Sequence, residues 1–312
     1  MKLSGALACG ILALAAPRAV LAQDSFQPIS LTAGEQRLPA LYRPALATPA
    51  RYRVIFIPGS GCTDMQPIAD RYFRGLLHAE VLVLQKPGVT PSDQPCTPEF
   101  VRHDALKSWA ATAGQALRSA SPTTLPQLLV GASEGAEILP YLSPQITNLR
   151  GLVMISSAGL DPRETLALQA RRLGAEAAYR EIGAAVASDQ DDLTPLQGRT
   201  LKYWRDLWNW RVTEYLLVSP VPVIQVWGGN DSLIPAEAYQ RFATLAVDAQ
   251  PARPPGKPPY ICSERLAQAD HGLQSRERDG LQWLWAKLEQ WARIPNSPPC
   301  AALSTHIDTA GH

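Results

Sequence analysis

Apolar side chains gather along the chain in short unbroken runs, and most runs are followed by a segment with helical apolar spacing. Unbroken apolar runs are typical of strands that are buried on both faces of a sheet. They predict strands within six segments: 52–61 (YRVIFIPGSG), 81–87 (VLVLQKP), 127–133 (QLLVGAS), 149–157 (LRGLVMISS), 221–229 (VPVIQVWGG) and 260–269 (YICSERLAQA). The spacing between them predicts helices at 67–77, 99–120, 134–142, 232–249 and 273–294.

This alternation of strands and helices predicts an α/β fold, with a mostly parallel sheet and helices on both faces. Two further short strands are predicted near the N-terminus, at 26–31 (FQPISL) and 36–44 (QRLPALYRP). Hydrophobic residues make up 46% of the 312 residues, which is ample material for such a core.

Segment 160–219 interrupts the alternation, because it is helical, charged and tryptophan-rich but contains no clear strand. We interpret it as a helical cap that is inserted after the strand at 149–157. The α/β core domain then consists of 23–159 and 220–295, and an irregular tail follows at 296–312.

Aromatic side chains crowd one part of the predicted cap: Tyr203, Trp204, Trp208, Trp210 and Tyr215. They either wall an acyl or aromatic pocket or pack the cap onto the core. For any single one of them, packing is the more common role.

The first 22 residues have the pattern of an export signal. Lys2 supplies a positive start, the apolar run at 6–16 is too short to cross a bilayer, and a small-residue cleavage pattern ends at Ala22. We therefore expect a periplasmic or secreted protein. No later segment has about 18 uninterrupted apolar residues, which argues against stable membrane insertion.

The charge balance gives no reason to expect a polyanionic partner. Without Lys2 and Arg18, which lie in the predicted signal, the chain has 27 basic and 28 acidic side chains. That balance does not favour nucleic acid as a partner. No C-x-x-C pair occurs and no histidine lies close to a cysteine, so a metal site has little support and we expect no cofactor.

A candidate nucleophile lies where the strand at 127–133 ends, in Gly131-Ala132-Ser133-Glu134-Gly135. In a G-x-S-x-G motif the turn is so sharp that the residues two before and two after the serine must be small. The motif alone is weak. It gains weight because it lies between a predicted strand and a predicted helix, as the mechanism requires.

A serine nucleophile generates an oxyanion, which two backbone N–H groups must stabilise. Glu134 directly follows the candidate nucleophile and is one expected donor. Ser60 is the other, in the glycine loop Pro58-Gly59-Ser60-Gly61 after the first buried strand. The alternative interpretation of this loop is an ordinary turn.

A candidate acid and a candidate base follow the last two predicted strands. Asp231 either orients a histidine or caps the next helix. His271 lies in a loop that leaves a strand and enters a helix, where a general base belongs, and the alternative is a surface histidine. Adjacent Asp270 competes as the acid. A sequence neighbour seldom reaches the ring nitrogen that faces away from the nucleophile, which favours Asp231.

In this order the motifs resemble those of the α/β-hydrolase superfamily, over about residues 25–294. IFIPGSG resembles the oxyanion-loop strand, LLVGASEG the nucleophile elbow, VWGGNDSLIP the acid loop and ADHGL the histidine loop. The resemblance implies a catalytic triad of Ser133, Asp231 and His271 and hydrolysis through an acyl-enzyme. Pro58 stands where many members have histidine. The Glu134 carboxylate would lie near the oxyanion, so we expect it to point into solvent or into a salt bridge.

Four cysteines lie beyond the predicted signal, an even number that suggests disulfides in an exported protein. Three pairings are possible. We favour Cys62–Cys96 and Cys262–Cys300, because each pair would then link loops that are close together in this fold. Four free thiols are the alternative.

The favoured function is an exported serine hydrolase that cleaves a carboxylic ester. A peptidase or amidase with the same triad is a second interpretation, because the motifs do not distinguish ester from amide leaving groups. A catalytically silent hydrolase fold used for binding is a third. The expected partner is a small-molecule ester or amide, and the sequence leaves the oligomeric state open.

Overall fold

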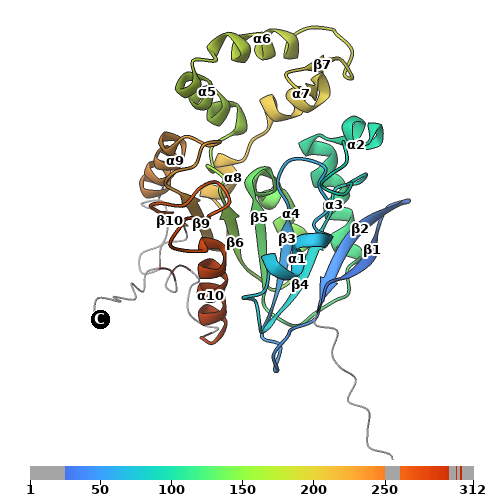
Figure 1. The fold of residues 1–312 in the computed structure, drawn as a ribbon, viewed down its shortest axis with the longest axis vertical. Coiled ribbons are helices and arrows are strands. Elements are labelled where there is room, and N and C mark those ends of the chain that lie inside the picture. The colour runs from blue at the N-terminus through green and yellow to red at the C-terminus, as the bar shows by residue number, and fades with distance from the viewer. Residues whose placement is uncertain (1–24, 250–260, 295–299, 301–302, 304–312) are drawn as a thin grey trace, which may run out of the picture.

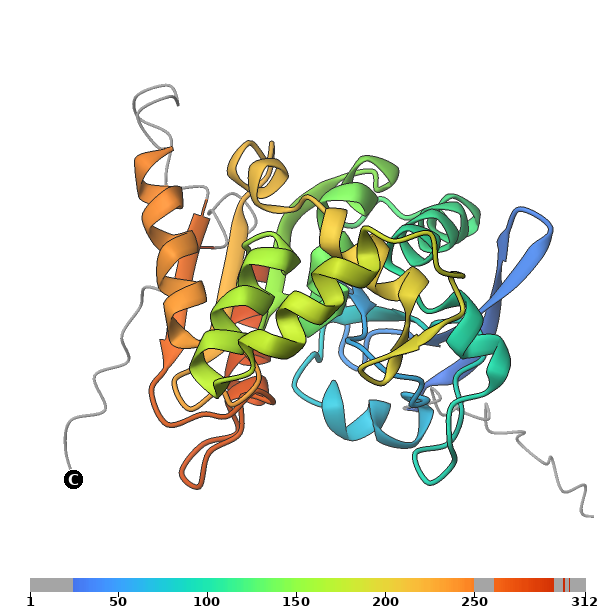
Figure 2. The same ribbon diagram turned by 90° about the horizontal axis from the view of Figure 1, so that it is seen from above.

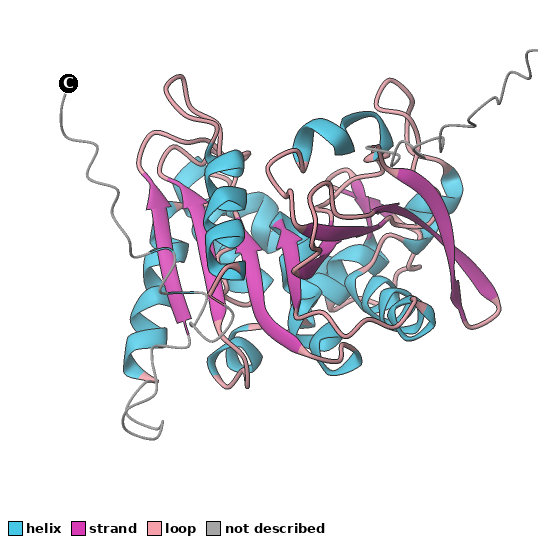
Figure 3. Cartoon of the chain, turned by 90° about the horizontal axis from the view of Figure 1, so that it is seen from below, coloured by secondary structure: helices cyan, strands magenta, loops and turns pink. Residues whose placement is uncertain are grey.

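An eight-stranded sheet with helices on both faces forms the centre of the molecule (Figures 1 and 3). The computed structural model describes residues 25–249, 261–294, 300 and 303, so the predicted export signal lies outside the described residues. The strands are β1 Gln27–Ala33, β2 Gln36–Arg43, β3 Tyr52–Ile57, β4 Ala79–Leu84, β5 Gln127–Ala132, β6 Leu149–Ile155, β9 Val223–Gly228 and β10 Ile261–Leu266.

The strand order is β1-β2-β4-β3-β5-β6-β9-β10. The β1–β2 and β2–β4 pairs are antiparallel, and every other neighbouring pair is parallel. β3 and β9 are buried along their whole length, as expected for strands covered on both faces. The parallel strands therefore end at one common edge, where sites in open α/β sheets form.

Two hydrophobic clusters cover the two faces of the sheet. Helices α1 Gln66–Tyr72 and α10 Gly280–Ala292 pack on one face, where Phe73 and Trp285 are fully buried. Helices α3 Leu106–Ser119, α4 Leu139–Leu142, α8 Thr213–Leu217 and α9 Ala236–Asp248 pack on the other. The predicted α/β layering is thus confirmed.

Some predicted helices begin or break elsewhere. The helix expected at 99–120 is two helices, α2 Pro98–His103 and α3, because Asp104 between them has a non-helical backbone and binds Lys86 through its side chain. The helix expected at 134–142 is a 3₁₀ turn, η1 Ser133–Ile138, followed by α4. A shorter 3₁₀ turn, η2 Ser143–Gln145, follows α4.

The last helix, expected at 273–294, begins at Gly280. Leu273 adopts a left-handed φ of 60°, which ends any helical path through that loop. The helix expected at 232–249 begins at Ala236, because the side chain of Asp231 binds the amides of the preceding turn.

Between β6 and β9 the chain forms α5 Pro162–Leu173, α6 Glu176–Val186, α7 Leu201–Asn209 and α8. The helices α5, α6 and α7 lie together over one end of the sheet, at the top of Figure 1 and toward the viewer in Figure 2. They share a small core of their own around Ile182, Tyr203 and Trp204. Contrary to expectation, the segment also contains a two-stranded hairpin, β7 Pro195–Leu196 and β8 Arg199–Thr200. We call the segment with these elements, residues 160–219, the cap.

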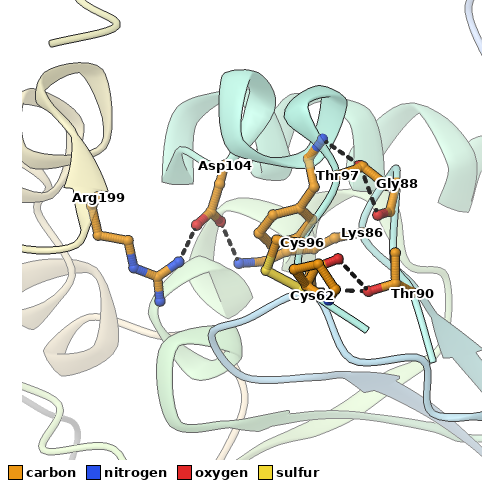
Figure 4. The surroundings of a disulfide bond; sticks show 10 residues. Cys62, Lys86, Gly88, Thr90, Cys96, Thr97, Asp104 and Arg199 are labelled. Atoms are coloured by element: carbon orange, nitrogen blue, oxygen red, sulfur yellow. Dashed lines mark hydrogen bonds and ion pairs between the residues drawn. A yellow bond between two sulfur atoms is a disulfide. The ribbon is translucent and has the colours of Figure 1, made fainter. Parts of the chain in front are cut away.

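The cysteines form the two predicted pairs, with Sγ–Sγ distances of 2.03 Å for Cys62–Cys96 and 2.28 Å for Cys262–Cys300. The first pair joins the loops that follow β3 and β4 (Figure 4). A backbone hydrogen bond from the Thr90 amide to the Cys62 carbonyl, 2.7 Å long, joins the same two loops. Among the helices that the structure describes, none is long and apolar enough to cross a membrane.

Candidate active site

Ser133 lies at the turn between β5 and η1 with a left-handed φ of 50°, which is rare for a residue with a side chain. The two flanking glycines explain how the chain makes this turn. A Cβ on Gly131 would lie 2.6 Å from the Ala136 backbone, and a Cβ on Gly135 would lie 2.3 Å from the Ile57 carbonyl oxygen. Both positions therefore require glycine, as the sequence motif predicts.

The glycine loop after β3 packs directly against this turn. A Cβ on Gly59 would meet the Ala132 carbonyl oxygen at 3.1 Å and the Ser133 Cβ at 3.3 Å. Ser60 lines the same cavity as Ser133 and Glu134. The two residues that the sequence predicts as oxyanion donors are thus both beside the candidate nucleophile.

The Asp231 and His271 side chains meet at the ends of β9 and β10. Nδ1 of His271 lies 2.8 Å from Oδ2 of Asp231, and the Asp231 side chain is only 2% exposed while that of His271 is 21% exposed. The hydroxyl of Tyr239 donates a second hydrogen bond to the same oxygen, 2.7 Å long. The other oxygen, Oδ1, accepts the amides of Leu233 and Ile234.

Asp231 therefore contacts His271 with one oxygen and the turn before α9 with the other, and it does not cap α9, whose N-cap residue is Pro235. Burial alone would raise its pKa, but the hydrogen bonds from His271, the Ile234 amide and Tyr239 hold the pKa below its usual value. The carboxylate stays ionised and oriented toward the imidazole.

Asp270, the competing acid, is occupied within its own loop. Its Oδ1 accepts the amides of Gly272 and Gln274 at 2.9 and 2.8 Å. The loop lies tightly against the strand that carries the acid, since a Cβ on Gly228 would be 2.1 Å from the Asp270 carbonyl oxygen. Asp270 thus shapes the histidine loop, and Asp231 is the acid that contacts His271.

Glu134 points into a salt bridge, one of its two expected orientations. Lys86 donates from Nζ to Oε1 of Glu134 at 2.5 Å and to Oδ1 of Asp104 at 2.9 Å. The hydroxyl of Tyr203 in the cap donates to Oε2 of Glu134 at 2.7 Å. Arg199, also in the cap, pairs with the other oxygen of Asp104 (Figure 4).

We call Lys86, Asp104, Glu134, Arg199 and Tyr203 the elbow network, because it anchors the residue after Ser133. Burial would raise the pKa of Glu134, but Lys86, the Tyr203 hydroxyl and Arg199 together hold the pKa below its usual value. The Lys86 pKa is raised in turn, since its two carboxylate partners outweigh the effect of burial. The Lys86–Glu134 ion pair therefore stays ionised near neutral pH.

A cavity of about 200 Å³ lies between the turn at Ser133 and the cap. Its walls come from η1, from the end of β6, from α5 and α7 of the cap, and from Leu233 and Ile234 beside the acid. This volume is below that of typical drug-sized pockets, so the cavity suits a small organic group.

The aromatic residues of the cap divide between the two roles considered for them. Tyr203 and Trp204 line the cavity. Trp208 packs against Tyr179 within the cap, and Trp210 and Tyr215 pack against Tyr141 of the core. Two of the five thus face the cavity, and the others hold the cap together or hold it on the core.

Ser133 and His271 are not hydrogen-bonded to each other in the described part of the chain, while the His271–Asp231 contact is formed. Such nucleophile–base contacts are often long in the absence of substrate and tighten only when substrate binds. No group of three or more potential metal ligands occurs within residues 25–249 and 261–294.

Sequence reasoning missed several polar residues of the site. Tyr239 lies in the first turn of α9, eight residues after Asp231, and nothing in its local pattern marks it as a partner. Lys86 could have been noticed in the sequence, because it closely follows an apolar run (VLVL) and such a position is often buried, as Lys86 is. Glu137 could have been noticed as an acid within an apolar stretch, and it lies in the cavity wall.

No protein-family model matches the chain, and no curated protein matches it significantly. Solved structures match along most of its length. Est1E from Butyrivibrio proteoclasticus is 14% identical, with 86% of this chain and 99% of that one covered and a TM-score of 0.58. The chain has the α/β-hydrolase fold.

Two further structures with this fold illustrate its range. The alpha/beta hydrolase domain-containing protein 10 from mouse is 17% identical, covers 86% of this chain and 99% of its own, and has a TM-score of 0.57. A Mycobacterium tuberculosis puromycin-hydrolysing peptidase is 14% identical over 88% of this chain and 40% of its own, with a TM-score of 0.58. At such identities the likeness concerns the α/β-hydrolase fold alone.

Proposed function

We propose that the protein is a serine hydrolase that cleaves a carboxylic ester through an acyl-enzyme on Ser133. The observation that carries this proposal is the 2.8 Å contact between Asp231 and His271, made at the same edge of the sheet as a serine held at positive φ. A buried carboxylate that accepts from one ring nitrogen leaves the other nitrogen free to act as a base.

His271 takes the proton of Ser133 as the serine oxygen attacks the ester carbonyl carbon. Asp231 keeps the Nδ1–H tautomer of His271 and stabilises the imidazolium that forms. His271 then protonates the leaving alcohol, and the acyl group remains on Ser133. Water attacks the acyl-enzyme in the same way and releases the acid.

The backbone N–H groups of Ser60 and Glu134 stabilise the oxyanion in both steps. The close packing of Gly59 on Ser133 supports this assignment, because it brings the loop backbone to the nucleophile. The elbow network contributes by fixing Glu134 from its side chain, so that its backbone N–H keeps one orientation during the reaction.

Export is part of the proposal. The first 22 residues carry the signal pattern, and the two cysteine pairs at disulfide distance suit an oxidising compartment such as the periplasm or the exterior. Mass analysis of the N-terminus of the protein recovered from its native host tests this part, with cleavage after Ala22 as the expected result.

Labelling with a fluorophosphonate probe tests the nucleophile. We expect wild type to be labelled on Ser133 and Ser133→Ala to remain unlabelled. Ser30→Ala is the control, because Ser30 is exposed on β1 at the outer edge of the sheet and should leave labelling intact. A folded wild type that is not labelled would overturn the proposal in favour of a binding role.

Paired substrates then test the leaving group. We expect p-nitrophenyl acetate to be hydrolysed with much higher kcat/KM than the matching p-nitroanilide. The opposite order, with Ser133 labelled, would establish a peptidase or amidase instead of an esterase.

A further inference from the structure

The cavity beneath the cap has a mostly apolar wall. Its apolar side chains come from the core and from the cap: Leu106, Pro162, Leu166, Trp204, Leu207, Leu233 and Ile234. Among its polar groups, Oε2 of Glu137, Oγ of Ser156 and Oγ1 of Thr165 have almost no accessible surface. The Glu134 carboxylate is already paired within the elbow network. The cavity therefore offers an apolar group a place out of water.

The proposed catalytic groups indicate which part of an ester enters this cavity. Ser133 lines it together with Ser60 and Glu134, the two proposed oxyanion donors. His271, which protonates the leaving alcohol, is not part of its described wall. The groups that hold the ester carbonyl thus border the cavity, whereas the group that serves the alcohol does not. This arrangement directs the acyl group into the cavity.

The size of the cavity limits the acyl group. An apolar cavity of about 150 Å³ accommodates one benzene molecule. The cavity in this protein has a volume of about 200 Å³. It therefore has room for roughly one ring with one or two further carbons, or for an unbranched chain of about six to eight carbons.

Trp204 is the bulkiest side chain in the wall and belongs to α7 of the cap. Its Nε1–H donates to the Leu196 carbonyl oxygen of the β7–β8 hairpin at 2.8 Å. Its ring packs edge-on against the Tyr203 ring, with the ring centroids 5.2 Å apart. Both rings belong to the small core of the cap. These contacts fix the indole, so it does not move aside for a longer chain.

We infer that this cavity is an acyl pocket for a short aliphatic or single-ring acyl group, and that Trp204 sets its upper size limit. The inference rests on the proposed esterase function and specifies its substrate class. An acyl group that ends in a carboxylate fits less well. No lysine, arginine or histidine lies in the described wall, and burying an unpaired charge is costly.

A series of p-nitrophenyl esters tests the pocket, because the leaving group stays constant while the acyl group grows. We expect kcat/KM to rise by about tenfold or more from acetate to hexanoate, since each added methylene is buried in the cavity. From hexanoate to decanoate we expect kcat/KM to fall by about tenfold or more, because the longer chain exceeds the available space.

Variants locate the size limit. Trp204→Ala should raise the ratio of decanoate to hexanoate kcat/KM by about tenfold or more, because it removes the indole from the wall. Trp208→Ala is the matched control. Trp208 packs against Tyr179 within the cap and is not in the described wall, so this ratio should stay as in wild type.

A second variant changes the cavity in the opposite direction. Leu166 lines the cavity from α5, and Leu166→Trp should fill part of the space. We expect it to lower the ratio of hexanoate to acetate kcat/KM by about tenfold. This variant keeps the test decisive where Trp204→Ala fails to fold.

Hexyl and decyl acetate test the assignment to the acyl side. A size limit that Trp204→Ala relieves in this alcohol series, and not in the acyl series, would overturn the acyl pocket. Equal kcat/KM for hexanoate and decanoate in wild type would overturn it as well, and so would an unchanged ratio in a folded Trp204→Ala. In each case the esterase function stands.

Calorimetry on Ser133→Ala separates this inference from the proposed function, because it requires no catalysis. Ethyl hexanoate should bind at least about threefold more tightly than ethyl acetate, through its buried methylenes, and more tightly than ethyl decanoate. That order supports the acyl pocket even if wild type hydrolyses no ester. Equal binding of the three esters, or tightest binding of ethyl decanoate, refutes it.

Discussion

The two halves of the proposed site are held in place by different kinds of contact. The side chains of Asp231 and His271 come from the core, from the neighbouring loops after β9 and β10. The amides of Gly229 and Asn230 donate to the carbonyls of Leu266 and Ala269, both at 2.9 Å. These are short-range backbone contacts between adjacent strands of one sheet.

The half with Ser133 and Glu134 depends on charged side chains that come from distant parts of the chain. Lys86 follows β4, while Tyr203 and Arg199 belong to the cap. The acid–histidine half contacts the cap through backbone carbonyls, since Arg172 of α5 donates to those of Asp231 and Ser232. The nucleophile half is coupled to the cap through the elbow network, so cap docking and oxyanion-donor position are linked.

The largest expected effect lies in the acid–histidine half. Asp231→Asn keeps the shape of the side chain but removes the charge that orients His271, so we expect kcat to fall on the order of 10³- to 10⁴-fold. Steady-state hydrolysis of p-nitrophenyl acetate measures this. A control with Asp270→Asn should lose far less, because that carboxylate binds only its own loop. Equal losses would show that Asp231 has no special role.

The next effect lies in the nucleophile half and concerns stability. Lys86→Met leaves the Glu134 and Asp104 carboxylates buried without their shared cation, and we expect the free energy of unfolding to fall by about 3–5 kcal/mol. Urea unfolding monitored by circular dichroism measures it.

Arg199→Met is the matched control for Lys86→Met. The Arg199 side chain is 28% exposed and Asp104 keeps its contact with Lys86, so the loss should be about 1 kcal/mol or less. If both variants lose the same stability, the network is not centred on Lys86.

The sequence alone predicted Ser133, Asp231 and His271, because each of these positions depends on a local pattern. Ser133 follows an apolar strand and is flanked by glycines at the two positions where a Cβ would clash. Asp231 and His271 each follow a strand, and the parallel alternation brings strand ends to one edge. Strand order, glycine spacing and residue type therefore suffice for these positions.

The contacts that hold the nucleophile half were not predictable in the same way. Lys86 and Glu134 are 48 residues apart, and Glu134 and Tyr203 are 69 apart. No periodicity links such positions, since their meeting depends on how the cap packs and on where β4 ends. The helix break at Asp104 has the same origin, because a tertiary ion pair replaces the helical path there.

A third test contrasts the buried acids of the two halves by pH. Asp231 is held ionised. Burial raises the Glu137 pKa from its usual 4.5 to about 8. The Ser157 hydrogen bond lowers this pKa, and the Glu134 and Asp161 carboxylates raise it. A raised pKa stabilises the fold fully below pH 4.5, and this stability is lost as pH rises toward 8. Wild type should therefore lose on the order of 2–3 kcal/mol more than Glu137→Gln between pH 5 and 8. Parallel pH dependences in urea unfolding would contradict a buried protonated Glu137.

The smallest expected effect allows the most direct comparison, because each half contains one tyrosine hydrogen bond of the same length. The hydroxyls of Tyr203 and Tyr239 each donate at 2.7 Å, to Glu134 and Asp231 respectively. Tyr203→Phe and Tyr239→Phe should each lower the free energy of unfolding by about 1–2 kcal/mol.

Hydrogen exchange then separates these two variants. Tyr203→Phe should increase amide exchange in α7 of the cap and leave α9 unchanged, because it loosens the contact between cap and elbow. Tyr239→Phe should leave α7 unchanged, since its partner lies within the core. If the α7 amides respond equally to both substitutions, the acid–histidine half is coupled to α7 as well, and the difference inferred between the two halves is wrong.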